Sequence, residues 1–107
     1  MRRIRGEIES AMSKLAIFKF RLYVAGDAPN STQALANLTA FCRAHLPDRY
    51  EIEVVDVFRE PKRALAESIF LTPTVVLLAP PPVRRIVGTL NHTLSLLLAL
   101  GLENSAE

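Results

Sequence analysis

The proline-rich segment 71–88 constrains the fold more than any other part of the chain, because it holds four of the seven prolines. Pro73 precedes five apolar or β-branched residues, 74–78, which predict a buried strand. Prolines at 80–82 then exclude both helix and sheet interior, because they have no backbone N–H to donate. Residues 83–87 predict a second short strand. The segment therefore predicts strand, rigid bend and strand, and its X-Pro bonds leave more than one conformation open.

Upstream, residues 17–25 show the clearest period of two in the chain. Such alternation predicts a strand with one buried and one solvated face. We expect the buried face to carry Phe18, Phe20, Leu22 and Val24, and the solvated face to carry Lys19, Arg21 and Tyr23.

A helix and a second strand are predicted next. Asn30 or Ser31 is expected to cap a helix over 31–46, which Pro47 ends. Residues 50–58 then predict a strand that is partly apolar on both faces. A strand, a helix and a strand in this order predict a right-handed parallel pair.

Two helices are predicted in the second half, one over 61–70 and one over 91–102. The last one carries two leucine stripes on nearly opposite sides. We expect Leu94, Leu97 and Leu98 to pack on the sheet. Leu96 and Leu100 would then be either an interface in a homodimer or homotetramer, or a tolerated exposed pair.

The predicted order of elements is β-α-β-α-β-β-α. A parallel βαβ unit followed by an antiparallel ββα unit indicates an α/β, thioredoxin-like fold with a mixed four-stranded sheet. Thr72-Pro73 falls where that fold has a cis-proline ahead of its third strand.

The chain is long enough for one hydrophobic core. We expect a single domain over 17–104 and a flexible N-terminal extension over 1–16. In that extension Ile4, Ile8 and Met12 lie four residues apart, which gives only a weak helical stripe.

One cysteine limits the chemistry that the chain can perform. A thioredoxin-like enzyme carries its thiols between the first strand and the first helix, where residues 26–30 contain none. Cys42 lies instead on the apolar face of the first predicted helix, so we interpret it as a buried structural thiol. The enzyme alternative is a redox protein that works through Cys42 alone.

No pattern predicts a catalytic, metal or cofactor site. Cys42 and His45 supply only two metal ligands, fewer than a zinc site needs. Asp56 lies within the second strand. Either neighbouring backbone holds it or it lies at the exposed end of the strand, and a role as a general base is a further alternative. A net charge of +2 gives no reason to expect nucleic-acid binding. No apolar run is long enough to cross a membrane, so we expect a cytoplasmic protein. Because no cofactor-binding motif is present, we expect no cofactor.

Arg84 and Arg85 follow directly after the three prolines. In a strand, neighbouring side chains point to opposite faces. Either both arginines are simply solvated, or the rigid bend presents one of them to an acidic partner.

Three parts of the chain together resemble the KaiB family of bacterial clock proteins. They are residues 22–31, residues 54–57, and residues 72–74 together with the run Pro-Pro-Pro-Val-Arg-Arg-Ile-Val-Gly at 80–88. The resemblance extends over about 18–102, and the proline–arginine run is its most specific part.

The resemblance implies a non-enzymatic regulator in circadian or stress-response signalling. Members of this family bind the ring ATPase KaiC, and in clocks they also engage KaiA and compete with a sensor histidine kinase. The family is known for two folds, a thioredoxin-like state and a tetrameric ground state with a rearranged second half. For this chain, the positions implicated in that change of fold are Pro73, Pro80, Pro81, Pro82, Ala99 and Gly101.

Departures from the family pattern qualify these expectations. Family lysines on the second strand and second helix are replaced by Glu53 and Ser68, which puts binding to a cyanobacterial KaiC in doubt. Ala99 stands where a glycine is common, and alanine favours a helix by ~1 kcal/mol, so we expect the thioredoxin-like state. By resemblance, the residues expected to contact a KaiC-like partner are Glu51, Glu53, Ser68, Arg84 and Arg85.

Overall fold

The computed structural model describes residues 16–102, so the expected N-terminal extension lies, apart from Ala16, outside the described residues. The predicted order of elements is confirmed. The elements are β1 (Phe18–Val24), α2 (Pro29–His45), β2 (Tyr50–Asp56), α3 (Pro61–Ala66), β3 (Thr74–Ala79), β4 (Arg84–Val87) and α4 (Thr93–Ala99).

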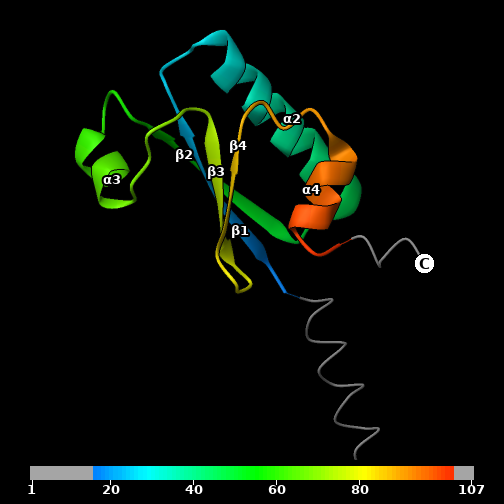
Figure 1. The fold of residues 1–107 in the computed structure, drawn as a ribbon. Helices are drawn as coiled ribbons and strands as arrows, with labels where there is room; N and C mark the ends of the chain where they lie inside the picture. The colour runs from blue at the N-terminus through cyan, green and yellow to red at the C-terminus, as the bar shows by residue number, and fades with distance from the viewer. Residues whose placement is uncertain (1–15, 103–107) are drawn as a thin grey trace, which may run out of the picture.

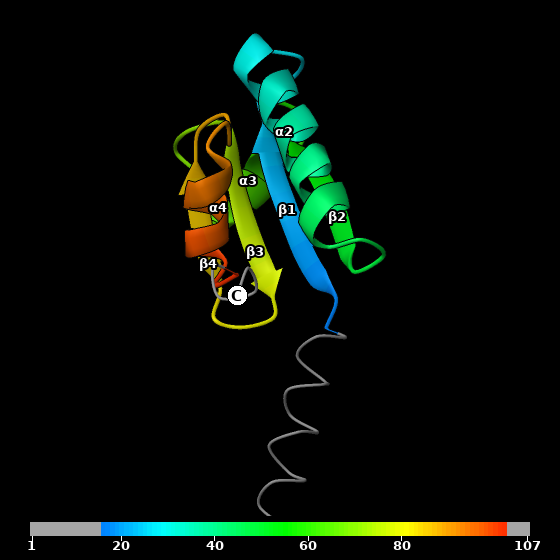
Figure 2. The ribbon, with the colours of Figure 1, turned by 90° about the vertical axis from the view of Figure 1, so that its right-hand side faces the viewer.

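The four strands form one mixed sheet with the order β2-β1-β3-β4. β1 and β2 are parallel, as a strand–helix–strand unit predicts, and β3 runs antiparallel to both β1 and β4. α2 and α4 cover one face of the sheet, and the short helix α3 lies on the other (Figures 1 and 2). The fold is therefore thioredoxin-like, as expected.

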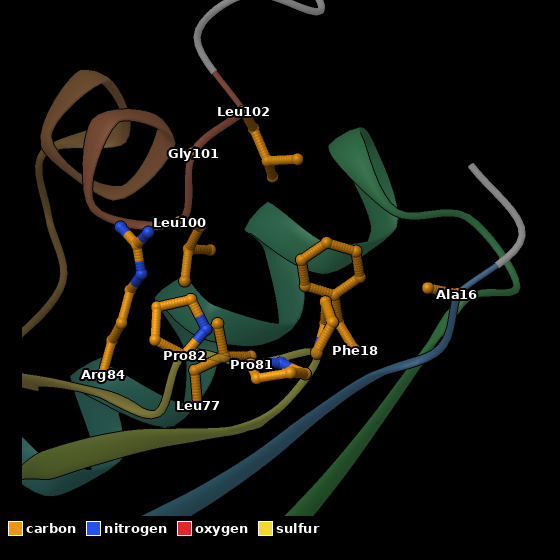
Figure 3. A pocket seen from close by; sticks show the side chains of 10 residues that line it. Ala16, Phe18, Leu77, Pro81, Pro82, Arg84, Leu100, Gly101 and Leu102 are labelled. Carbon is orange, nitrogen blue, oxygen red and sulfur yellow. The ribbon is translucent and has the colours of Figure 1, made fainter. Parts of the chain in front are cut away.

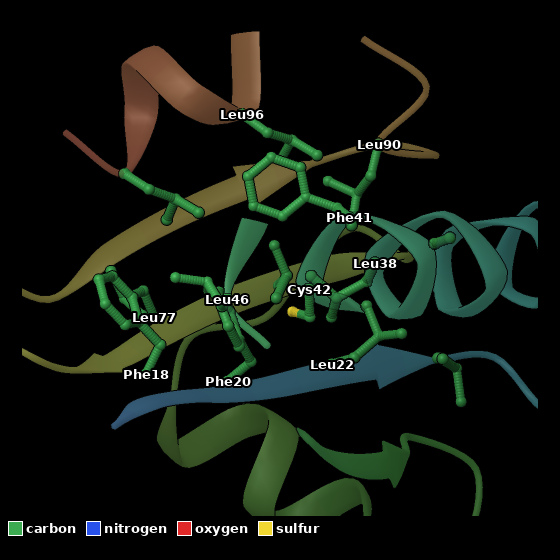
Figure 4. Packing of buried hydrophobic residues seen from close by; sticks show 14 residues of the cluster. Phe18, Phe20, Leu22, Leu38, Phe41, Cys42, Leu46, Leu77, Leu90 and Leu96 are labelled. Atoms are coloured by element: carbon green, nitrogen blue, oxygen red, sulfur yellow. The ribbon is translucent and has the colours of Figure 1, made fainter. Parts of the chain in front are cut away.

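The larger core lies between the sheet and the α2/α4 pair (Figure 4). The predicted apolar face of β1 points into it, and each fully buried Leu or Phe side chain contributes about 1.5–3 kcal/mol. The side chains that the sheet and the two helices contribute include Phe18, Phe20, Leu22, Leu38, Phe41, Leu46, Leu77 and Leu96.

A smaller core lies under α3 on the opposite face of the sheet. It consists of Tyr23, Val55, Ala64, Ile69 and Val76. The expectation that Tyr23 is solvated together with Lys19 and Arg21 is wrong, because α3 covers the end of β1 where Tyr23 lies and leaves it 0% exposed. β1 is thus solvated on this face only at its beginning.

The predicted start of the first helix is wrong by two residues. α2 begins at Pro29, whose ring already favours helical φ, and its N-cap is Ala28 rather than Asn30 or Ser31. The Ser31 hydroxyl instead accepts a hydrogen bond from the Ala25 N–H at 3.1 Å. Ser31 therefore ties the helix back to the end of β1.

The assignment of the two leucine stripes in the last helix is wrong for every leucine except Leu97, which packs against the larger core as expected. Leu96 and Leu100 are buried in the larger core at 3% and 7% exposure. Leu94 and Leu98 are exposed instead, at 66% and 54%. α4 begins at Thr93 rather than 91, and it packs with the face that we expected to be either an interface with another copy or an exposed pair. Leu96 and Leu100 are thus core residues and not a free interface in this fold.

The β3–β4 connection follows the predicted strand, bend and strand. The Thr72-Pro73 bond is cis, as the fold plan predicts, and the Ala79-Pro80 and Pro81-Pro82 bonds are cis as well. The connection turns the chain so that β4 pairs with β3 along Leu77↔Arg84 to Thr74↔Val87.

Candidate functional site

The loop between β1 and α2 occupies the position of the thiol pair in a thioredoxin-like enzyme. Backbone N–H groups of this loop donate hydrogen bonds to neighbouring residues. Gly26 adopts a left-handed backbone with φ +57°, and its N–H donates to Asp56 Oδ1 at 3.1 Å. The same carboxylate oxygen accepts the Phe58 N–H at 2.9 Å. Asp56 is therefore held by neighbouring backbone, which is one of the alternatives that the sequence leaves open, and it joins the ends of β1 and β2.

Cys42 is the cysteine of the chain, and it is fully buried. Its thiol lies among leucines of α2 and β1 in the larger core (Figure 4). Burial raises its pKa to about 12, so the reactive thiolate is scarce near neutral pH. The prediction of a buried structural thiol is confirmed.

Arg84 and Arg85 point to opposite faces of β4, and each binds the end of a different helix. Arg84 donates through Nη1 to the Ala99 carbonyl, the last residue of α4. Arg85 donates to the Glu67 and Ser68 carbonyls at the end of α3. Cations are favourable at helix C-termini, where carbonyls lack intrahelical partners. The two arginines thus link β4 to the helix on each side of the sheet.

Both helices end in a Schellman arrangement, which exposes the carbonyls that the arginines reach. After α4, the Gly101 N–H donates to Leu98 O at 3.2 Å and the Leu102 N–H to Leu97 O at 2.8 Å. After α3, Ser68 takes the left-handed position with φ 56°. Ser68 ends α3 four residues earlier than the predicted limit of 70, because its backbone leaves the helical region.

Glu53 is the centre of a set of ion pairs on the α3 side of the sheet. Its carboxylate accepts hydrogen bonds from Arg21 at 2.8 Å and from Arg63 at 3.0 Å. These two bonds hold the pKa of the Glu53 carboxyl below its usual value, with the Arg21 bond the larger cause. β1, β2 and α3 are therefore joined at their solvent side.

Glu67 extends the charged set to β4. It lies 3.7 Å from Arg21 and 3.7 Å from Arg85. Exposed ion pairs contribute little stability each, so we assign these contacts to orientation more than to folding energy. They fix alternating charges along the surface around α3.

Four large apolar side chains are exposed on α3 and on its two connections. Phe58 is 74% exposed, Leu65 69%, Phe70 80% and Leu71 64%. Phe58 precedes the helix, Leu65 lies on it, and Phe70 and Leu71 follow it. Together with Glu53, Ser68 and Arg85, we call these residues the α3 surface. Exposed aromatic residues beside charged ones are typical of a protein–protein interface.

The structure places all but one of the residues expected to contact a partner on the α3 side of the sheet. Glu51 and Glu53 share the face of β2 that carries α3, and Ser68 lies beside Arg85. Glu51 is 3.9 Å from Lys19. Arg84 lies apart, because its side chain is on the α4 side.

The four exposed apolar residues were not predicted. A sequence signal exists in Phe70-Leu71, an apolar pair that fits neither the helix before it nor the strand after it. Phe58 and Leu65 look like ordinary core residues in the sequence, because Phe58 ends the apolar second strand that the pattern predicts and Leu65 lies between two alanines of a predicted helix. Phe70 and Leu71 lie beyond the end of α3, which ends at Ala66.

Among residues 16–102 no three His, Cys, Asp or Glu side chains are grouped closely enough to hold a metal ion. Within the same range, no helix has the length and apolarity needed to span a bilayer.

The fold is shared with solved thioredoxin-like proteins of low sequence identity. Chloroplastic thioredoxin z matches with a TM-score of 0.68 at 17% identity, over 92% of this chain and 89% of that chain. The N-terminal domain of Synechococcus elongatus SasA also matches with a TM-score of 0.68 at 17% identity, over 86% and 87%. The fold and its loop without cysteine define a thioredoxin-like protein that lacks the thiol pair of a thioredoxin.

The sequence comparisons give the family. Residues 21–102 match the KaiB domain. The circadian clock protein KaiB3 of Synechocystis sp. is 42% identical over 80 residues, which cover 75% of this chain and 78% of that protein. The circadian clock oscillator protein KaiB of Thermosynechococcus vestitus is 39% identical over 85 residues, 79% of this chain and 79% of that protein. The chain belongs to the KaiB family.

Proposed function

We propose that this chain is a non-enzymatic regulatory protein that binds a KaiC-like ring ATPase through the α3 surface, in circadian or stress-response signalling. Membership of the KaiB family supports this class of partner. The buried thiol and the self-satisfied β1–α2 loop give no support to the alternative, a redox protein that works through Cys42.

The observation that carries the proposal is the exposure of Phe58, Leu65, Phe70 and Leu71 around one six-residue helix. Aromatic side chains that become buried at an interface often dominate its binding energy. The charged residues beside them, Glu53 and Arg85, would form a polar rim that sets orientation.

The departures from the family pattern bear on the choice of partner. Glu53 and Ser68 replace lysines that the family commonly carries. Because a reversed charge at an interface disfavours the wrong partner, we expect the cognate ATPase of the same organism to bind better than a cyanobacterial KaiC. A KaiA-like protein or a sensor histidine kinase remains a further candidate partner on the basis of the family resemblance.

Co-purification with the cognate KaiC-like ATPase tests the proposal. The assay compares wild type with Cys42→Ala, in ATP, in ADP and in a non-hydrolysable ATP analogue. A regulatory role predicts a complex in at least one nucleotide state that Cys42→Ala retains. Failure to form a complex in every nucleotide state would reject the proposal, and loss of function only in Cys42→Ala would favour the redox alternative.

A further inference from the structure

β4 lies at one edge of the sheet, and within residues 16–102 the only strand that pairs with it is β3. The Gly88 N–H donates to the Pro73 carbonyl at 2.9 Å, which makes these two residues a hydrogen-bonded pair of the antiparallel ladder. Because such pairs alternate with non-bonded pairs along the ladder, the N–H and C=O groups of Arg85 and Val87 point away from β3. The backbone donors and acceptors of these two residues therefore line an open strand edge.

A groove of about 300 Å³ lies next to this edge, between the end of β4 and the beginning of α4. Figure 2 shows the strand and the helix together at that side of the molecule. Ile86 and Leu96 contribute apolar side chains to the lining, and Ser95 contributes a small, exposed one. Such a groove beside an open edge can receive every second side chain of an added strand.

Contacts at both ends of α4 hold the walls of the groove in place. Before the helix, Asn37 of α2 donates through Nδ2 to the Thr89 carbonyl at 2.7 Å. At its end, Arg84 donates to the Ala99 carbonyl, and Figure 3 shows Arg84 beside this end of the helix. The groove is therefore formed before a partner arrives, which lowers the ordering entropy that binding costs.

The charges around the edge favour an acidic partner. Apart from His92, the ionisable side chains between residues 68 and 102 are Arg84 and Arg85, and this range has no Asp or Glu. Glu67 lies 3.7 Å from Arg85, but the arginine side chain remains partly exposed. A residue of an added strand directly opposite Arg85 would carry its side chain on the same face, within reach of the guanidinium.

We propose that the open edge of β4 binds an extended segment of a partner protein, which adds to the sheet as a further antiparallel strand. The segment carries an apolar residue opposite Val87, an aliphatic residue opposite Ile86 and an acidic residue opposite Arg85. The middle side chain enters the groove. Main-chain hydrogen bonds supply the affinity, while the groove and Arg85 select the sequence. This edge shares Arg85 with the α3 surface, but its main-chain groups and its groove are separate from that surface.

Fluorescence anisotropy with a labelled synthetic peptide, Gly-Ser-Thr-Val-Ile-Glu-Thr-Ser-Gly, tests the edge in the full-length chain. Lysine in place of the glutamate is expected to weaken binding about tenfold, because like charges would then face each other. A methyl group on the glutamate amide nitrogen removes the hydrogen bond to the Arg85 carbonyl, and it is expected to weaken binding at least about tenfold. Absence of binding, or equal binding of the three peptides, would overturn the proposal.

Variants of the protein test the same edge from the other side. Val87→Pro removes the outward N–H and leaves the β3–β4 ladder bonded, whereas Val87→Thr is the matched control that keeps this N–H. We expect peptide binding at least about tenfold weaker for the proline variant and unchanged for the threonine variant. Ser95→Phe fills the groove from an exposed position and is expected to weaken binding about tenfold, which keeps the test decisive if the proline variant does not fold.

Unchanged peptide binding in Ser95→Phe and in a folded Val87→Pro variant would refute the assignment of the edge. A particle larger than the monomer in light scattering that dissociates when peptide is added would also refute it, because a second copy of the chain would then occupy the edge. No ATPase is present in these assays, so their outcome is independent of the proposed binding to a KaiC-like ATPase.

Discussion

At the residue scale, Arg84 and Arg85 have the same chemistry and opposite structural roles. The alternation of a strand predicts that they point to opposite faces, and this prediction is confirmed by their separate contacts with α4 and α3. Their binding targets were not predictable, because the carbonyls that they reach lie 15 and 17 residues or more away in sequence. A contact at that separation depends on the packing of the helices and leaves no local pattern.

Substitutions of the two arginines should therefore raise hydrogen exchange at the ends of two different helices. Arg84→Met keeps most of the aliphatic stem and removes the bond to Ala99, so exchange at Leu100 and Gly101 should rise about tenfold. Arg85→Met should instead raise exchange at Ser68 and Ile69. If both variants loosened the same helix, the assignment of one arginine to each helix would be wrong.

Cys42 makes a prediction about pH. Its folded-state pKa of about 12 is raised above its ordinary value of 9.0, so the native protein holds the thiol proton more tightly than the unfolded chain does. The contribution of the protonated Cys42 thiol to the free energy of unfolding is therefore fully present below about pH 9. It is lost as the pH rises toward 12.

The measurement is the free energy of unfolding between pH 7 and 10.5 for wild type and Cys42→Ala. The variant should be less stable by about 1 kcal/mol at pH 7, from the lost packing of one heavy atom, and the difference should shrink as the pH rises above 9. A difference that stays constant with pH would show that the thiol titrates equally in both states.

At the scale of elements, α4 shows what helical spacing leaves undecided. The sequence predicts a leucine-rich helix correctly, but the spacing of the leucines does not decide which of them meet the sheet. Leu96 and Leu97 pack on the core, whereas Leu94 and Leu98 are exposed. The choice depends on where the helix begins and on the direction from which β4 delivers it. Leu90, with a left-handed φ of 63°, and the hydrogen bond from Asn37 Nδ2 to the Thr89 carbonyl at 2.7 Å fix that direction.

The reversal of the stripes predicts unequal costs for two similar substitutions. Leu96→Ala should lower the free energy of unfolding by about 2–5 kcal/mol, because Leu96 is a core residue. Leu94→Ala should change it by less than about 0.5 kcal/mol, because Leu94 is mostly exposed. Denaturant unfolding of both variants measures the difference. Equal costs, or a larger cost for Leu94→Ala, would contradict the orientation of α4.

At the scale of the whole molecule, the sequence predicts the fold well and the surface poorly. The order of elements and the parallel β1–β2 pair follow from local patterns such as the alternation in 17–25 and the prolines at 80–82. The α3 surface does not, because exposure of Phe58 and Phe70 depends on how short α3 is and on which strand end it covers. The sequence also does not predict the burial of Tyr23, because that burial depends on which strand end α3 covers.

The two faces of the molecule now have distinct assignments. The α3 surface combines exposed apolar side chains with fixed charges, and we assign it to the partner. The opposite side carries α2 and α4, and from Ile86 to Leu102 the sequence has no Asp, Glu, Lys or Arg. Exposed leucines on that side, Leu94 and Leu98, therefore provide a matched apolar control for the α3 surface.

Equilibrium binding to the cognate KaiC-like ATPase, in the nucleotide state that supports co-purification, tests the central claim most directly. It compares wild type with Phe70→Ser/Leu71→Ser on the α3 surface and Leu94→Ser/Leu98→Ser on α4, after unfolding curves show that both variants are folded. We predict that the Phe70/Leu71 variant binds at least about thirtyfold more weakly, because it removes two exposed apolar anchors, and that the Leu94/Leu98 variant matches wild type. The opposite pattern, with binding lost only in the α4 variant, would contradict the assignment of the α3 surface as the docking site.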